Sequence, residues 1–183
     1  MSKIMNRANT QAILIDMQDR LLAVMPEKEE LVHRMETLLK GLAVLHIPVT
    51  VTQQYTKGLG MTDERLMEAG GLSGYLDKIT YSCYADEAIR EQIRKDPLRT
   101  TVLLFGIETH ICLWQTAQDL LEEGYAVEVV CDCVASRKES DREIALRRLE
   151  KSGAVLTTTE ACLFELLEKA GTDEFRAISK LIK

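Results

Sequence analysis

Short apolar runs alternate along this chain with longer segments in which apolar residues recur every three or four positions. The short runs predict strands, and the longer periodic segments predict helices. We expect strands at 11–16, 47–52, 79–84, 100–105, 126–131 and 154–157. We expect helices at 27–45, 85–95, 109–123, 140–151, 160–169 (capped by Thr159) and 173–182. The glycine-rich stretch 53–77 predicts a long loop with a helical turn near 63–69, and loops of that length are usually functional.

Continuous apolar strands that alternate with helices are typical of a parallel sheet covered on both faces. Right-handed crossovers then give a three-layer αβα, doubly wound, Rossmann-like α/β fold with six strands in the order 3-2-1-4-5-6. We interpret residues 1–183 as a single domain. Ligands of such sheets bind at the carboxyl ends of the strands, where the strand order reverses. In this order the strands at 11–16 and 100–105 are neighbours at that point.

Composition narrows the class of partner. The chain has 183 residues, of which 46% are hydrophobic and 28% charged, with a net charge of −6. The negative charge and the lack of a basic stripe disfavour nucleic acid as a partner. No apolar run approaches the length of a membrane span, and the amino-terminal residues do not resemble a secretory signal. Five irregularly spaced cysteines then indicate reduced thiols in the cytoplasm.

This topology places two residues at the reversal point, and a third is expected where the next strand begins beside it. Asp16 ends the first strand, Cys112 follows the strand 100–105 at the start of a helix, and Lys78 follows the glycine-rich loop. A helix amino terminus favours a thiolate, a carboxylate can accept the proton of a thiol, and an ammonium group can balance the charge. The backbone N–H groups from Gly106 to Thr109, with that of Cys112, can form an oxyanion hole. The pattern indicates a cysteine nucleophile.

Each of these residues also has an ordinary structural interpretation. A carboxylate at a strand end is often a loop or cap residue, and a free cysteine is most often inert core filler. A lysine such as Lys78 is most often a solvated surface charge. The functional interpretation therefore depends on Asp16, Lys78 and Cys112 meeting at one place.

At these positions the chain resembles the isochorismatase-like cysteine hydrolases. The resemblance covers nearly the whole sequence, and several segments are similar to the branch called isochorismatase domain-containing proteins. The segments that carry it are Ile13-Leu14-Ile15-Asp16-Met17-Gln18, 53–60, Lys78, Gly106-Ile107-Glu108-Thr109-His110-Ile111-Cys112, 132–137, 141–142 and 175–183.

The resemblance implies a catalytic triad with Asp16 as base, Lys78 as electrostatic support and Cys112 as nucleophile. It also implies a cis peptide bond between Ile107 and Glu108, which directs the N–H groups of Glu108 and Cys112 at one oxygen. The implied reaction is attack on a carbonyl carbon, a covalent acyl-enzyme, loss of an amine and hydrolysis. A homo-oligomer acting on a small molecule is expected from the same likeness.

Two departures from the family pattern refine this expectation. Nicotinamidases of the family bind a metal through an acid and histidines after the second strand, where this chain has Gln53 and Gln54 and no histidine. We therefore expect no metal, no cofactor and no nicotinamidase activity. True isochorismatases generally lack the cysteine, so Cys112 argues against cleavage of a vinyl ether.

Candidate substrate contacts surround the predicted triad in the sequence. These are Gln54, Tyr55, Tyr84, His110 and Trp114. Tyr84 and Trp114 fit an apolar pocket wall or a subunit contact equally well, and His110 fits a solvent or interface position as well as a substrate contact. Cys131 and Cys133 are read as ordinary residues at a strand end, because further metal ligands are not placed nearby.

Two other functions are consistent with this fold. One is a catalytically silent scaffold or binding protein, because one fold can serve many functions. The other is a nucleotide-binding Rossmann protein, which is disfavoured because Asp16 leads into Met17-Gln18-Asp19 without the glycine-rich turn that binds phosphates.

Overall fold

A six-stranded parallel sheet forms the centre of the molecule in the computed structural model, which describes residues 5–183. The strand order is β3-β2-β1-β4-β5-β6, which confirms the predicted order 3-2-1-4-5-6 and the doubly wound α/β class. The strands are β1 (Thr10–Ile15), β2 (Val49–Gln54), β3 (Leu76–Lys78), β4 (Thr101–Ile107), β5 (Ala126–Ala135) and β6 (Val155–Thr157).

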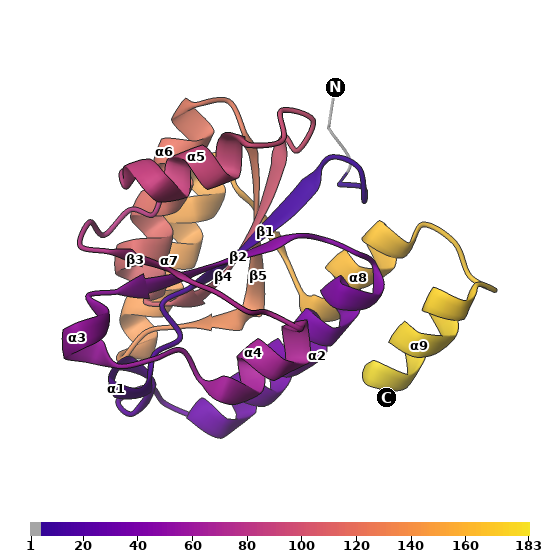
Figure 1. Cartoon of the computed structure of the whole chain (residues 1–183), viewed down its shortest axis with the longest axis horizontal. Helices are drawn as coiled ribbons and strands as arrows, with labels where there is room; N and C mark the ends of the chain where they lie inside the picture. Colours follow the sequence, from indigo (N-terminus) through magenta and orange to yellow (C-terminus); the bar gives the residue numbers. More distant parts are fainter. Residues whose placement is uncertain (1–4) are drawn as a thin grey trace.

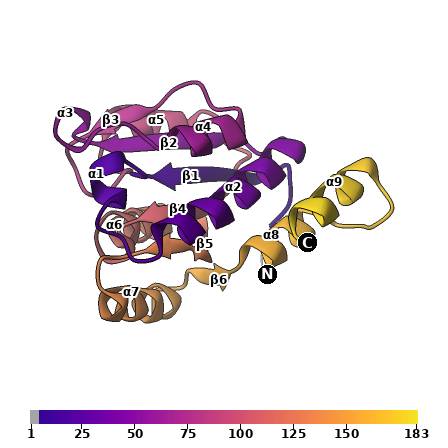
Figure 2. The ribbon, with the colours of Figure 1, turned by 90° about the horizontal axis from the view of Figure 1, so that it is seen from below.

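Helices cover both faces of this sheet (Figures 1 and 2). One face carries α2 (Lys28–Val44), α4 (Glu64–Gly70), α8 (Thr159–Leu167) and α9 (Asp173–Leu181). The other carries α5 (Glu87–Arg94), α6 (Trp114–Glu122) and α7 (Glu139–Lys151). The short helices α1 (Asp19–Leu22) and α3 (Thr56–Leu59) follow β1 and β2. Figure 2 places them at the carboxyl edge of the sheet, opposite the carboxyl-terminal α9.

The two faces of the sheet supply two separate apolar cores. Leu14 of β1 and Phe105 of β4 belong to the cluster under α2 and α8, whereas Ile13 and Leu104 belong to the cluster under α5 and α6. Every residue of β1 and β4 is buried. Burial on both faces explains why these strands read as continuous apolar runs rather than as alternating ones.

The prediction of a strand at 79–84 is wrong. The structure has only turns and bends there, and the edge strand β3 comes earlier, pairing with the end of β2 in the register Gln54–Lys78. The β-prone composition of 79–84 was misleading, because Ile79 and Tyr81 are 77% and 56% exposed. The chain turns instead because the carbonyl oxygens of Thr80 and Tyr81 accept hydrogen bonds from the Lys78 ammonium.

Other element boundaries also differ from the predictions. The segment predicted as helix 109–123 begins with a π-helical turn, η1 (Thr109–Leu113), and continues as α6. The strand predicted at 126–131 extends to Ala135. Thr158, rather than Thr159, caps α8, since the Thr158 hydroxyl accepts from the backbone N–H of Ala161.

Gly106 allows β1 and β4 to approach closely at their carboxyl ends. It pairs with Ile15 and has a φ of +124°, a backbone conformation that other residues adopt rarely. A Cβ atom at Gly106 would lie 2.2 Å from the carbonyl oxygen of Ile15. The residues that follow, Asp16 and Ile107, are therefore brought side by side by the lack of a side chain at position 106.

None of the helices within residues 5–183 combines the length and the apolar character needed to cross a membrane.

Replacement of Gly106 tests this close approach. We expect Gly106→Ala to lower the free energy of unfolding by about 3 kcal/mol or more, because backbone strain and a clash with Ile15 add together. Gly124→Ala is the control, since its φ is +85° but its added Cβ meets nothing within 4 Å. We expect about 1 kcal/mol there. Urea unfolding followed by circular dichroism measures both, and equal losses would contradict the close approach.

Candidate active site

Asp16 lies immediately beyond β1 in a left-handed backbone conformation, with φ of +52°. Its side chain is fully buried, and its two oxygens have different partners. Oδ1 accepts a hydrogen bond of 2.8 Å from the Thr52 hydroxyl of β2, and Oδ2 lies 2.7 Å from Nζ of Lys78. The carboxylate is thus fixed from two neighbouring strands.

Lys78 ends β3 and is also fully buried, with all three ammonium hydrogens accounted for. Its Nζ donates to Oδ2 of Asp16, to Oε1 of Gln54 at 2.6 Å and to the carbonyl oxygen of Thr80 at 3.2 Å. Burial lowers the pKa of Lys78, but the Asp16 carboxylate, which attracts the ammonium and accepts a hydrogen bond from it, raises this pKa, and the overall direction is upward. A cation enclosed by acceptors in this way remains charged.

Cys112 lies on η1 and is buried, although 7% of its surface remains exposed. Burial raises the pKa of its thiol, the negative charge of Asp16 raises it further, and the positive charge of Lys78 lowers it. The direction is opposite to the thiolate that a helix amino terminus was expected to favour. Desolvation and the nearby carboxylate exceed the effect of the short π-helical turn, so the resting group is a neutral thiol that needs a base.

The peptide bond between Ile107 and Glu108 is cis. Glu108 is buried, and its carboxylate accepts from the backbone N–H of Arg137 at 3.0 Å and from Nε of Arg137 at 3.1 Å. The Thr109 hydroxyl donates to the carbonyl oxygen of Ala135 at 2.9 Å. Both contacts fasten the turn that precedes Cys112 to the carboxyl end of β5.

The structure brings some predicted substrate contacts to this site. Gln54 binds Lys78 through Oε1 and donates from Nε2 to the carbonyl oxygen of Ile79, so it supports the ammonium. Tyr55 follows it with a φ of +40° and is 54% exposed. His110 is directed toward the end of β5, with Nδ1 2.9 Å from the Ser136 hydroxyl.

Tyr84 and Trp114 are placed elsewhere. The Tyr84 hydroxyl accepts from Nε of Arg94 and its ring packs edge-on against Tyr125, which precedes β5 and so lies at the amino edge of the sheet. The Trp114 ring lies 3.8 Å from the guanidinium carbon of Arg148 on α7. Both side chains therefore pack against neighbouring elements rather than against Asp16.

Sequence reasoning assigned no role to four residues that support the site. Gln18 joins the ends of β1 and β2, since Oε1 accepts from the N–H of Gln54 and Nε2 donates to the carbonyl oxygens of Gln54 and Gly60. Thr52, Cys83 and Thr116 are fully buried polar or thiol groups beside Asp16 and Cys112. For Gln18 and Thr52, the sequence does offer a signal, which is a polar residue near the carboxyl end of a buried strand.

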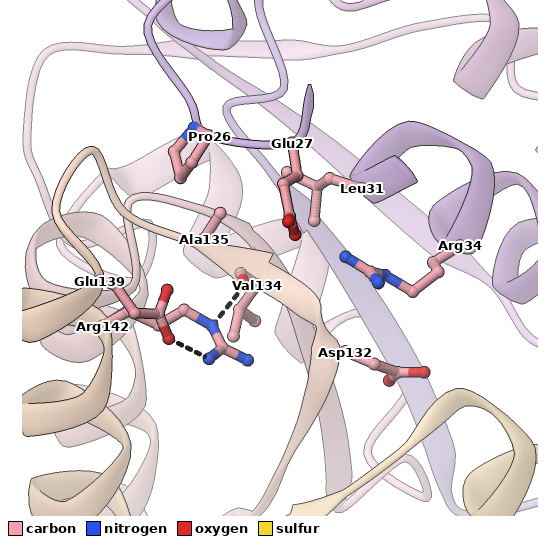
Figure 3. A pocket seen from close by; sticks show the side chains of 9 residues that line it. All are labelled: Pro26, Glu27, Leu31, Arg34, Asp132, Val134, Ala135, Glu139 and Arg142. Atoms are coloured by element: carbon pink, nitrogen blue, oxygen red, sulfur yellow. Dashed lines mark hydrogen bonds and ion pairs between the residues drawn. The ribbon is translucent and has the colours of Figure 1, made fainter. Parts of the chain in front are cut away.

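A cavity of about 330 Å³ opens between α2, β5 and the start of α7 (Figure 3). Arg34 and Asp132 line it together with residues of α7. Asp16, Lys78 and Cys112 do not line this cavity. Within residues 5–183, no cluster of three or more histidine, cysteine or acidic side chains is arranged to hold a metal ion.

The model of the isochorismatase domain matches residues 10–161. The chain belongs to the isochorismatase family. The secreted isochorismatase effector Isc1 of Phytophthora sojae is 38% identical over 172 residues, which are 92% of this chain and 81% of that protein.

Two further proteins illustrate the range of similar chains. Isochorismatase domain-containing protein 1 of Danio rerio is 36% identical over 92% of this chain, which spans only 59% of that protein. A solved structure named MAR1 ribonuclease from Caenorhabditis elegans is 34% identical, has a TM-score of 0.89, and matches 97% of this chain and 91% of its own.

Removal of Lys78 tests the buried ion pair. We expect Lys78→Met to lower the free energy of unfolding by about 3–5 kcal/mol, because Asp16 is left as an uncompensated buried charge. The double variant Asp16→Asn/Lys78→Met should recover much of that loss. Lys40→Met is the control, since Lys40 pairs with Glu36 at the surface and such pairs contribute about 0–1 kcal/mol. Urea unfolding at neutral pH measures all three, and equal effects of Lys78→Met and Lys40→Met would contradict a buried charge on Asp16.

Proposed function

We propose that residues 1–183 act as one hydrolase domain, which cleaves the C–N bond of a small amide-like substrate through a thioester on Cys112. The observation that carries the proposal is the buried hydrogen bond of 2.7 Å between Lys78 and Asp16, with Cys112 within the electrostatic influence of both. Membership of the isochorismatase family supports hydrolysis as the reaction class.

The first half of the reaction transfers the acyl group to sulfur. Asp16 accepts the proton of the Cys112 thiol while Sγ forms a bond to the substrate carbonyl carbon. The backbone N–H groups of Glu108 and Cys112 donate to the oxygen that becomes negative. The tetrahedral intermediate then breaks its C–N bond, and Asp16 gives the proton to the departing amine. Lys78 balances the charge of Asp16 throughout.

The second half releases the acid. Water gives a proton to Asp16 as its oxygen attacks the thioester carbon, the C–S bond breaks, and Asp16 returns the proton to Sγ. The neutral thiol that burial favours is both the start and the end of this cycle. This explains why a raised pKa at Cys112 is compatible with a nucleophile, since the proton moves only when the C–S bond forms.

Gln54 contributes by holding Lys78, and exposed Tyr55 beside it is a substrate contact in this proposal. We also propose a homo-oligomer, for which the family resemblance and the exposed Tyr55, Ile79 and Tyr81 provide support. The proposal places the protein in the cytoplasm, because all five cysteines are free. Size-exclusion chromatography with light scattering tests the assembly, and cell fractionation tests the location.

A panel of amides and ureides, assayed for ammonia release, tests the reaction. We expect turnover of at least one compound, a loss of about 10³-fold or more in kcat for Cys112→Ala, and about 10²–10⁴-fold for Asp16→Asn. Denaturing mass spectrometry of the quenched reaction should detect an acyl group on Cys112. Cys131→Ser is the control, because Cys131 lies on β5 away from the triad.

Two results would contradict this proposal. A catalytically silent scaffold would release ammonia from none of the compounds and would form no acyl-enzyme with them. The Caenorhabditis elegans protein is called a ribonuclease, so RNA belongs in the same assay. RNA cleavage that persists in Cys112→Ala would show a different activity from the one proposed, and the net charge of −6 disfavours it.

A further inference from the structure

Three buried residues outside the proposed reaction connect the Asp16 carboxylate to the backbone of Cys112. The Thr52 hydroxyl lies 2.8 Å from Oδ1 of Asp16 and 3.6 Å from Sγ of Cys83. The backbone N–H of Cys83 donates to the Thr116 hydroxyl at 2.9 Å, and that hydroxyl donates to the carbonyl oxygen of Cys112 at 2.7 Å. Cys83 is therefore the common point of two short hydrogen-bonded chains.

The direction of each hydrogen bond follows from what the terminal groups accept. An ionised carboxylate only accepts, so the single hydroxyl hydrogen of Thr52 is directed at Asp16. Toward Cys83, the Thr52 oxygen can then only accept, and the Cys83 thiol must donate. The carbonyl oxygen of Cys112 likewise takes the hydrogen of Thr116, which leaves the Thr116 oxygen to accept from the backbone of Cys83.

Cys83 is suited to donate because it is a neutral thiol. It is fully buried, and desolvation, together with the charge of Asp16, raises the pKa of Cys83 to about 11. The titratable groups around the Asp16 carboxylate are the Lys78 ammonium from β3 and the neutral thiols of Cys83, from the segment after β3, and of Cys112 from η1. From β2 come Thr52 and Gln54, which are neutral.

We propose that Thr52 and Cys83 are positioning residues that hold the Asp16 carboxylate in the orientation in which it can accept the proton of the Cys112 thiol. The inference rests on the proposed function, in which Asp16 is the base. Thr52 fixes Oδ1 as Lys78 fixes Oδ2, so the carboxylate cannot rotate about its Cβ–Cγ bond. The Cys83 thiol orients the Thr52 hydroxyl by donating a hydrogen bond to the Thr52 oxygen, whose own hydrogen is directed at Asp16.

Alkylation of Cys112 by acrylamide tests this without knowledge of the substrate. The rate of adduct formation is measured as a function of pH on the whole protein, with the site of modification identified by peptide mass. We expect the rate to fall on the acid side, because a carboxylic acid cannot accept the proton of the thiol. In Thr52→Val this acid limb should move upward by about one pH unit or more, because the ionised carboxylate loses a hydrogen bond. Thr52→Ser, which keeps the hydroxyl, should restore it.

The role of Cys83 is separated by two substitutions. Cys83→Ala removes the donor to Thr52 and should move the acid limb in the same direction by a smaller amount. Cys83→Ser keeps a donor and should lie closer to the unmodified protein. A thermal melt of each variant separates these effects from loss of folding, since destabilisation alone lowers Tm but leaves the acid limb in place.

A second buried cysteine–threonine pair supplies the matched control. Sγ of Cys133 lies 3.2 Å from the Thr159 hydroxyl, and Cys133 belongs to the apolar cluster on the other face of the sheet. Cys133→Ala removes a comparable thiol from a comparable environment. We expect it to lower Tm and to leave the pH dependence of Cys112 alkylation unchanged.

The possible outcomes distinguish a failure of the positioning roles of Thr52 and Cys83 from a failure of the proposed function. An acid limb that disappears in Asp16→Asn but stays in place in both Thr52→Val and Cys83→Ala would overturn the positioning roles alone. A profile that Asp16→Asn leaves unchanged, or a Cys112 that does not react in the unmodified protein, would overturn the proposed function as well. An upward shift in Thr52→Val with recovery in Thr52→Ser would support both.

Discussion

The buried pair of Asp16 and Lys78 is the interaction on which the rest of this site depends. Neither side chain is exposed, and two charges removed from water are tolerated only when they meet closely and their remaining hydrogen-bonding groups are satisfied. The carboxyl end of β2 supplies Thr52 and Gln54, and the turn after β3 supplies the carbonyl oxygen of Thr80. The topology of the sheet thereby determines which residues surround the pair.

The same pair reconciles two properties of Cys112 that otherwise conflict. A buried thiol beside a carboxylate resists ionisation, which is unfavourable for a nucleophile at rest. In the proposed reaction Asp16, held in place and charge-balanced by the Lys78 ammonium, takes the thiol proton only when Sγ attacks the substrate carbon. A neutral resting thiol is also less open to adventitious oxidation, since the thiolate is the reactive form.

The sheet order and the convergence of Asp16, Lys78 and the Cys112 segment could be predicted from the sequence. Apolar runs that alternate with helical periodicity leave few topologies, and the reversal of strand order fixes which strand ends are neighbours. The position of β3 could not be predicted, because the composition of 79–84 favours a strand. In the structure this segment turns, and the carbonyl oxygens of Thr80 and Tyr81 accept hydrogen bonds from the Lys78 ammonium. The directions of Tyr84 and Trp114 depend on partners far along the chain, Tyr125 and Arg148, which local pattern does not reveal.

The residues of the site follow strands that occupy different positions in the sheet. Asp16 and Cys112 follow β1 and β4, which lie side by side in the interior of the sheet, whereas Lys78 ends the three-residue edge strand β3. Edge elements open at a lower free-energy cost than central ones, and amide hydrogen exchange reports such local opening. A fluctuation that frees β3 would withdraw the ammonium and leave the acid and thiol in place. Local opening of the sheet edge would therefore affect the cationic component of the site before the other two.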